Sequence, residues 1–295
     1  MQTKHEIQAL LAAQGASANT HYGQHFLIDL NLMRLIVESA TITDRDVVLE
    51  VGCGTGSLTE ALVDEAGHVV AVDLDTTVFS IAQAQLADAD NVTLLNCDVL
   101  KNKHTLNPMV TDAIRMARRR HDGRLLLVAN LPYHVASAVI MNCVIGAQAV
   151  DAFAVTVQKE VGDRMLAASG GRAYGSLSIW LHCAGDMTLL RVLKPGVFWP
   201  PPQVNSALIR FTRNQRSLDQ IKDVGLLRDI IELFLGHRRK MLKACIKTTH
   251  GRLAAIDNWQ ELFSHCHVDP TCRPDHVSPE QYVALANAVC ELDVL

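Results

Sequence analysis

The sequence has no apolar run long enough to cross a membrane and no closely spaced pair of cysteines. Its eight cysteines are scattered without a C-x-x-C motif, which is typical of reduced thiols in a cytosolic protein. The first residues lack the basic-then-apolar pattern of a secretion signal. We therefore expect no membrane association, no disulfide framework and a cytoplasmic location.

Aromatic residues form only 5% of the chain, and no internal repeat or low-complexity tract is present. Any nucleic acid would therefore be bound through its shape and phosphates more than through stacking.

Histidines and cysteines lie close together in residues 265–276, but their spacing matches no common zinc site. We interpret that segment as a polar loop and expect no bound metal.

Charge is unevenly distributed along the 295 residues, whose net charge is -4. Residues 1–190 hold 13 Lys and Arg against 20 Asp and Glu, whereas residues 191–295 hold 14 against 11. Residues 210–247 alone hold 10 basic side chains against 4 acidic ones. This asymmetry fits an acidic catalytic domain joined to a basic, phosphate-binding domain, and it fits a solvated helix face equally well.

Apolar runs typical of buried parallel strands alternate with helical or loop segments in the first half of the chain. This pattern predicts a doubly wound α/β sheet of the Rossmann-like type, which binds its ligands at the carboxyl ends of the strands. The predicted strands cover residues 47–51, 69–72, 92–95, 125–128 and 153–157.

Proline and glycine in residues 194–196 and 200–202 interrupt this alternation. Beyond Asn214 the pattern predicts only helices, over residues 224–235, 238–247 and 279–291. We therefore expect a catalytic domain over residues 1–213 and a small, all-helical, basic domain over residues 214–295.

The first predicted strand leads into Gly52-Cys53-Gly54-Thr55-Gly56, where glycines permit a tight turn and let a ligand approach the backbone. Asp73 ends the second strand, and its carboxylate could accept hydrogen bonds from ribose hydroxyls. Asp98 follows the third strand and could accept the exocyclic amine of an adenine. These features fit both an NAD-dependent dehydrogenase and an S-adenosylmethionine-dependent methyltransferase. Ser57, in place of the third glycine of G-x-G-x-x-G, favours the methyltransferase.

The fourth predicted strand leads into Asn130-Leu131-Pro132-Tyr133, a more specific signal than the glycine loop. The exocyclic amine of adenine is a weak nucleophile because its lone pair is delocalised into the ring. The Asn130 oxygen and a carbonyl aimed by Pro132 could each accept one of its N–H groups, while Tyr133 stacks on the base. This tetrad predicts methyl transfer to adenine N6; a strand that simply ends in a turn is the alternative.

These segments resemble the ribosomal small-subunit adenine dimethyltransferases, and the resemblance runs from about Tyr22 to the C-terminus. It implies that Tyr133 stacks the target base. It also implies dimethylation of two adjacent adenines in a terminal rRNA hairpin of the assembling small ribosomal subunit, and we expect a monomer. The other segments that resemble family motifs are residues 22–27, 158–161, 173–175, 198–207 and 237–240. The implied cofactor contacts are His25, Leu27, Gly52, Gly54, Asp73, Asp98 and Asn130.

Two basic segments could hold RNA. Arg238, Arg239, Lys240 and Lys243 fall within about two helical turns and could grip phosphates, or they could face solvent or pair with acids. Residues 115–120 precede the catalytic strand and could line the same groove or form a charged loop.

Two other functions remain open. One is a related enzyme that methylates large-subunit rRNA and confers macrolide resistance, although such enzymes usually have Ile at the position of Leu131. The other is a non-catalytic assembly or transcription factor of the same fold.

Overall fold

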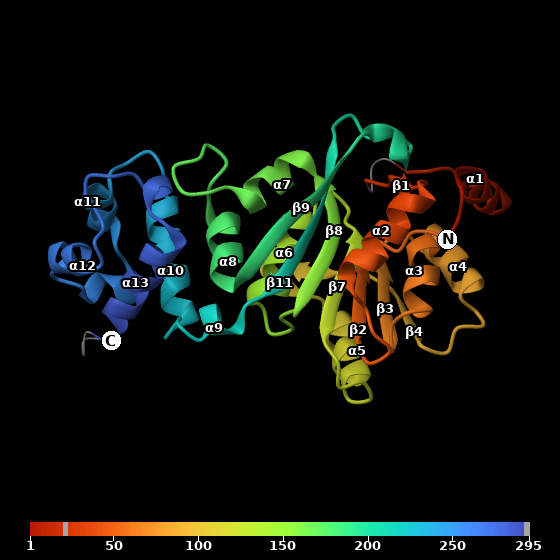
Figure 1. Cartoon of the computed structure of the whole chain (residues 1–295), viewed down its shortest axis with the longest axis horizontal. Helices are drawn as coiled ribbons and strands as arrows, with labels where there is room; N and C mark the ends of the chain where they lie inside the picture. Colours follow the sequence, from red (N-terminus) through yellow and green to blue (C-terminus); the bar gives the residue numbers. More distant parts are fainter. Residues whose placement is uncertain (20–22, 292–295) are drawn as a thin grey trace. The chain divides into compact units, whose positions relative to one another are not determined.

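The computed structural model describes residues 1–19 and 23–291 (Figure 1); Tyr22 lies outside these ranges. The chain divides into two compact units, of which the first contains Met1–Gly162 and Met187–Arg213. The second contains Asp163–Asp186 and Asn214–Leu295, so residues 163–186 accompany the helices that follow residue 213. That the two units are separate domains stays a prediction. Within the described ranges, no helix is both long and apolar enough to span a membrane.

The first unit is built on a seven-stranded sheet with the order β4-β3-β2-β7-β8-β11-β9. Parallel pairings join β4 to β3, β3 to β2, β2 to β7 and β7 to β8. These are the strands predicted from the apolar runs, and their parallel arrangement is confirmed. The strands of the sheet are β2 (Val47–Val51), β3 (His68–Asp73), β4 (Val92–Asn96), β7 (Leu125–Asn130), β8 (Ala152–Gln158), β9 (Gly185–Leu193) and β11 (Ser206–Arg213).

Helices cover this sheet, and the middle strands are accordingly buried along almost their whole length. Met33 and Ile36 of α2 (Leu30–Ala40) lie fully buried in one cluster with Val48 and Leu126, so α2 packs on the sheet through its apolar stripe. α5 (Pro108–Arg118) contacts β2, β3 and β4. The other helices of this unit are α1 (Lys4–Ala13), α3 (Ser57–Val63), α4 (Thr76–Gln85), α6 (Ala136–Ile145) and the 3-10 turn η2 (Pro195–Val197).

Two short pairings bring distant segments together. β1 (Phe26–Leu27) pairs antiparallel with β10 (Phe198–Trp199), which sets two of the family-like motifs side by side. β5 (Leu100–Asn102) and β6 (Thr105–Leu106) form a hairpin between β4 and α5.

The strands β9 and β11 were not predicted, and the sheet continues in β11 after the interruption at residues 194–202. β11 pairs antiparallel with β8, with Ser206 opposite Gln158, so the chain returns to the sheet after the prolines. β9 lies at the edge, where most of its side chains are at least partly exposed. An edge strand needs no continuous apolar run, and its sequence therefore carries little signal.

The second unit is helical around an aromatic cluster of Phe234, Trp259, Phe263 and Tyr282. The predicted helices over residues 224–235 and 279–291 are confirmed as α10 (Val224–Leu235) and α13 (Pro279–Cys290). Its other elements are α8 (Ser176–Ala184), α9 (Gln215–Leu218), α11 (Leu242–Cys245), α12 (Trp259–His265) and the 3-10 turns η3 (Ile246–Thr248), η4 (Gly251–Ala255) and η5 (Pro274–His276), while α7 (Lys159–Leu166) spans the division between the units.

The single helix predicted over residues 238–247 is wrong in its first half. Turns follow the end of α10, and α11 begins only at Leu242. The N–H groups of Leu242 and Lys243 donate to the carbonyls of Cys272 and Pro270 at 3.0 and 2.9 Å. Tertiary hydrogen bonds thus satisfy the first N–H groups of α11, so no preceding helical turn is needed.

Candidate active site

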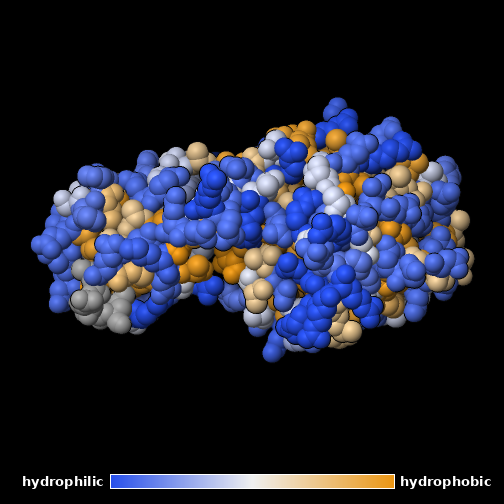
Figure 2. All heavy atoms as spheres, turned by 60° about the horizontal axis from the view of Figure 1, so that its bottom comes forward, coloured by the Kyte–Doolittle hydropathy of each residue, from blue (hydrophilic) through white to orange (hydrophobic). Residues whose placement is uncertain are grey.

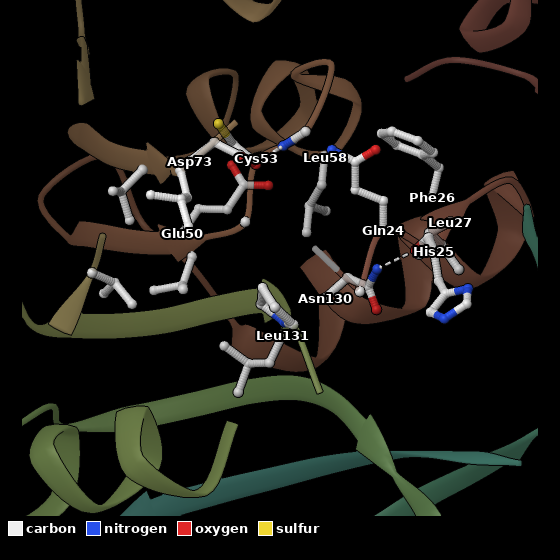
Figure 3. Close-up of a pocket in the computed structure, with 18 of the residues that line it drawn as sticks. Gln24, His25, Phe26, Leu27, Glu50, Cys53, Leu58, Asp73, Asn130 and Leu131 are labelled. Atoms are coloured by element: carbon white, nitrogen blue, oxygen red, sulfur yellow. Dashed lines mark hydrogen bonds between the residues drawn. The ribbon is translucent and has the colours of Figure 1, made fainter. Parts of the chain in front are cut away.

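A pocket of the first unit lies at the carboxyl ends of β2, β3 and β7 (Figure 3). Glu50, Asp73 and Asn130 come from these three strands and surround the same cavity. Leu27 of β1 and Ile7 of α1 complete its walls. Ligands of open α/β sheets bind at this edge, so the structure brings the predicted strand-end residues together where a ligand is expected.

The glycine loop requires glycine for two reasons. Gly52, Gly54 and Gly56 have φ values of 78°, 56° and 84°, a left-handed region that strains other residues. A Cβ on Gly52 would lie 2.8 Å from Cγ of Pro132. The loop that follows β2 is therefore in direct contact with the tetrad that follows β7.

The two predicted cofactor acids occupy neighbouring strand ends. The Asp73 carboxylate accepts hydrogen bonds from the N–H groups of Gly54 and Asp75 at 2.8 and 2.9 Å, while burial raises the pKa of its carboxyl group. A carboxylate offers about four lone-pair sites, so Asp73 can accept further hydrogen bonds from a ligand. Asp98 is exposed, lines the pocket and accepts from the Leu100 N–H at 2.9 Å.

Asn130 is held at both ends of its amide group. Its Nδ2 donates to the His25 carbonyl at 2.8 Å, the dashed line in Figure 3. Its Oδ1 accepts a hydrogen bond from the hydroxyl of Thr156, which is fully buried in β8. An amide oxygen has two lone pairs. Asn130 can therefore accept one more N–H group while it keeps this orientation.

The middle of the tetrad is anchored by the main chain. Leu131 is only 1% exposed, and its N–H donates to the Thr156 carbonyl at 3.2 Å. The Pro132 carbonyl accepts from the N–H groups of Val135 and Ala136 at 3.2 and 3.1 Å, which begins α6. The turn is thus fixed between β7 and α6.

The Tyr133 ring faces the His25 ring, with centroids 5.4 Å apart and planes inclined by 30°. Its hydroxyl lies 2.7 Å from Oγ of Ser206, and burial raises its pKa, so the phenol stays neutral. His25 Nδ1 lies 2.7 Å from the Pro200 carbonyl, which can only accept, so Nδ1 carries the proton. In Figure 3 the His25 imidazole points away from the acidic side chains, and the contact drawn with Asn130 is made by the main-chain carbonyl of His25.

The sequence did not predict the residues that support the site through hydrogen bonds to the residues lining the pocket. Gln2 is 5% exposed. Its side chain donates to the Thr55 carbonyl at 3.1 Å and accepts from the Thr55 hydroxyl at 2.7 Å. Its main-chain N–H donates to Oγ of Ser57 at 2.7 Å. A lone glutamine gives no sequence signal for this role, whereas Thr156 could be found once β8 is set in register, because it lies opposite Asn130.

Glu50 is a further acid that the sequence reasoning did not place in the pocket. It is 2% exposed, and its Oε2 accepts from the Thr59 hydroxyl at 2.6 Å. Burial, reinforced by the nearby Asp73 charge, raises its pKa to about 8. The side chain is therefore mainly protonated at neutral pH, which limits the negative charge of the pocket.

The predicted RNA-binding side chains lie in the second unit and differ in their surroundings. Arg238 is half-buried, and its Nε lies 3.6 Å from the Asp275 carboxylate. Arg239, Lys240 and Lys243 are exposed, and the structure gives them no ion pair with any described residue. Three of the four predicted cations thus face solvent, whereas Arg238 is engaged within its own unit.

The cysteines and histidines form no metal centre in the described ranges, where no three His, Cys, Asp or Glu side chains could hold an ion together. All eight cysteines are free thiols. Burial raises the pKa of Cys53, which lines the pocket, so this thiol is protonated and unreactive.

The fold matches those of two solved methyltransferases. A dimethyladenosine transferase from Plasmodium falciparum aligns with a TM-score of 0.69 at 22% identity, covering 88% of this chain and 96% of that one. The 23S rRNA methyltransferase ErmE aligns with a TM-score of 0.63 at 20% identity, covering 90% and 100%. At such identities the likeness concerns the fold alone. It defines a class I methyltransferase fold with a helical C-terminal region, as the sequence predicts.

Sequence comparison identifies the family within this class. The model of the ribosomal RNA adenine dimethylase family matches residues 15–290. Ribosomal RNA small subunit methyltransferase A of Lachnoclostridium phytofermentans is 34% identical over 272 residues, which cover 92% of this chain and 91% of that protein. The protein of the same name from Lactiplantibacillus plantarum is 32% identical over 289 residues, covering 98% and 95%. The chain belongs to the ribosomal RNA adenine dimethylase family.

Proposed function

We propose that this protein transfers methyl groups from S-adenosylmethionine to N6 of two adjacent adenines in a terminal hairpin loop of small-subunit rRNA. It would act as a cytoplasmic monomer on an assembling small ribosomal subunit. The observation that carries the proposal is Asn130, whose amide is fixed between His25 and Thr156 beside the glycine loop. The relatives named for small-subunit rRNA, at 34 and 32% identity, support the substrate class.

The donor set of the pocket suits S-adenosylmethionine. The positive φ values of the glycine loop let a ligand approach the main chain. Asp73 would hold the ribose, Asp98 would accept the adenine amine, and Leu27 would supply an apolar wall. Bound there, S-adenosylmethionine supplies an electrophilic methyl group. The proposed cofactor contacts are His25, Leu27, Gly52, Gly54, Asp73, Asp98 and Asn130.

The tetrad would activate the target amine by accepting both of its N–H groups. Asn130 Oδ1 is one acceptor. We assign the second role to the Leu131 carbonyl, because the Pro132 carbonyl already accepts from two N–H groups at the start of α6. Two accepted hydrogen bonds shift electron density back onto N6 and place its lone pair toward the methyl group.

Tyr133 would stack on the target adenine and hold it in the plane that the two acceptors define. The hydrogen bond to Ser206 fixes the ring, and the raised pKa of the phenol keeps it uncharged. No strong base is needed, because N6 becomes acidic once it gains the methyl group. The base must leave its stack to enter, at a cost of a few kcal/mol that favours a loop. Arg239, Lys240 and Lys243, with Arg238, would grip RNA phosphates.

Transfer of labelled methyl groups to unmethylated small ribosomal subunits tests this function, with naked rRNA and large subunits as parallel substrates. We expect incorporation into small subunits only, recovered as dimethyladenosine. The Asn130→Ala variant should lose it while still binding cofactor, more weakly, through the remaining contacts. Asn31→Ala, at an exposed asparagine of α2, is the matched control and should retain full activity.

The other functions give different outcomes. Incorporation into large subunits only would identify the resistance-type enzyme. Cofactor binding without transfer to any RNA would contradict the enzymatic proposal and favour an assembly or transcription factor.

A further inference from the structure

The exposed face of α5 carries a cluster that the proposed function does not use. Val110, Ile114 and Ala117 face the sheet and are buried. The opposite face exposes Met109 and Met116, at 53 and 62%. Four exposed arginines, here called the arginine patch, occupy the end of the helix and the turn after it, where Figure 2 shows deep blue atoms gathered in the lower centre of the view. The arginine patch consists of Arg115, Arg118, Arg119 and Arg120.

The carboxylates near the patch already have basic partners. Asp112 pairs with Arg115 at 2.6 Å, Asp122 with Arg45 at 2.6 Å, and Asp46 with Arg124 at 2.6 Å. The remaining three arginines of the patch have no ion pair with any residue that the structure describes. The helix dipole stabilises cations at this end of α5. It supplies no ion-pair partner, so three guanidinium groups remain exposed to solvent.

This positive charge is local. The first unit as a whole holds 15 Lys and Arg against 18 Asp and Glu, whereas residues 112–124 hold 5 against 2. A concentrated patch on an acidic unit attracts polyanions at one place only, which orients a partner rather than binding it everywhere.

The patch lies at the opposite edge of the sheet from the tetrad. Gly123 N donates to the Arg45 carbonyl at 3.0 Å, and Val47 N donates to the Arg124 carbonyl at 2.9 Å. The turn after the patch is thus tied to the amino ends of β2 and β7, whereas Asn130 ends β7. The six residues of β7 separate the two edges by about 17 Å. The interpretation of residues 115–120 as only a charged loop is wrong, because residues 115–118 belong to α5, and the patch lies apart from the tetrad.

We propose that the arginine patch binds the phosphate backbone of a second segment of small-subunit rRNA, remote from the methylated loop. This inference rests on the proposed function and specifies how the enzyme would recognise a folded subunit rather than the loop alone. Guanidinium groups without protein partners match phosphates in charge and in bidentate geometry, and the patch needs no base contact to act.

The test compares a variant in which Arg118, Arg119 and Arg120 are all replaced by Gln with the wild-type protein. Filter binding to small subunits and methyl transfer at limiting subunit concentration are measured over a range of salt. We expect affinity to fall about tenfold and the slope of log affinity against log salt to decrease by about two to three, since each lost phosphate contact removes about 0.9. The transfer rate at saturating subunits should be unchanged, and so should the affinity, in filter binding, for a short RNA that holds only the target loop.

Two control variants test whether the effect depends on the charge of the patch and on its location, and a melting measurement tests whether the fold is kept. Replacing the same three arginines by Lys keeps the charge and should retain most of the affinity and the salt slope. Replacing Lys4 and Arg34, exposed cations elsewhere on the first unit, by Gln should have little effect. Melting temperatures of all variants report whether the helix end stays folded.

Three results would overturn the inference. One is an unchanged affinity and salt slope in the Gln variant. Another is a Lys variant as weak as the Gln variant in both affinity and salt slope, which would show that the loss does not follow the charge of the patch. The third is an equal loss of affinity for the short RNA that holds only the target loop. If the proposed function itself fails, the wild-type protein transfers no methyl group at all, while filter binding still reports on the patch.

Discussion

Replacing Thr156 by valine would test whether Asn130 needs the hydrogen bond from the Thr156 hydroxyl to keep its orientation. The substitution keeps the shape of a fully buried side chain and removes only the hydroxyl that donates to Asn130 Oδ1. Asn130 keeps its second hydrogen bond, from Nδ2 to the His25 carbonyl at 2.8 Å. The amide would therefore stay in place but lose one of the two contacts that fix its plane.

The expected magnitude follows from a single neutral hydrogen bond, which contributes about 0.5–1.5 kcal/mol net. If that energy orients the acceptor in the transition state, kcat should fall by about two- to tenfold, because 1.36 kcal/mol corresponds to a factor of ten. The KM for S-adenosylmethionine should change little, since Thr156 does not line the pocket. The free energy of unfolding should fall by about 1 kcal/mol.

Single-turnover methyl transfer at saturating cofactor and RNA measures this effect without product release. Thr156→Ser is the matched control, because it keeps the hydroxyl and removes a buried methyl group at a cost of about 1 kcal/mol in stability. We expect Thr156→Ser to be less stable than the wild type yet close to it in rate. Equal loss of rate in both variants would refute the reasoning, as it would assign the effect to packing. So would an undiminished rate in Thr156→Val.

Three further predictions concern the cofactor pocket. Gln2→Ala removes the side-chain bonds to Thr55 and should cost about 1–3 kcal/mol in stability and weaken cofactor binding in calorimetry; an unchanged Kd would contradict a supporting role. Gly52→Ala combines φ of +78° with a Cβ 2.8 Å from Pro132, so it should cost about 1–2 kcal/mol and most of the activity. Gly196→Ala, with no atom within 4 Å of its Cβ, should be neutral in the same assays. Burial raises the pKa of Glu50 from its usual 4.5 to about 8, so the folded protein binds a proton that the unfolded chain releases. Its contribution to stability is fully present below pH 4.5 and is lost toward pH 8 at about 1.4 kcal/mol per pH unit. Glu50→Gln should abolish this slope in denaturant titrations across that interval, and parallel curves for the two proteins would refute it.

The strand-end residues of the site could be predicted because their signals are local. Glycines before a helix, an acid at the end of β3 and the tetrad after β7 each follow a recognisable apolar run. Parallel strands place such residues at one edge whatever the loops between them do. The strand order was needed only to show that Gly52 and Asn130 are neighbours, because β2 pairs with β7.

The last two strands of the sheet order, β11 and the edge strand β9, illustrate what local patterns leave out. β11 is buried on both faces for only its first four residues, and it follows a proline-rich segment that resembles a boundary. Its place is decided by β8, which offers an open edge to Ser206 and the residues after it. The same limit applies to Arg238–Lys240: no helical turn forms there, because the first N–H groups of α11 donate to the distant carbonyls of Cys272 and Pro270.

The tetrad and the residues behind it differ in how sequence encodes them, and this difference bears on function. A side chain that faces the ligand must have a particular chemistry, so Asn130 and Tyr133 are recognisable by type. A side chain that only orients Asn130 must donate one hydrogen bond from the right place, which Thr156 does because the register of β7 and β8 sets the two residues opposite each other. Many residues could meet that requirement at many positions. The presence of the tetrad therefore predicts the reaction, whereas its rate depends on pairings such as Thr156 with Asn130 that only the folded chain reveals.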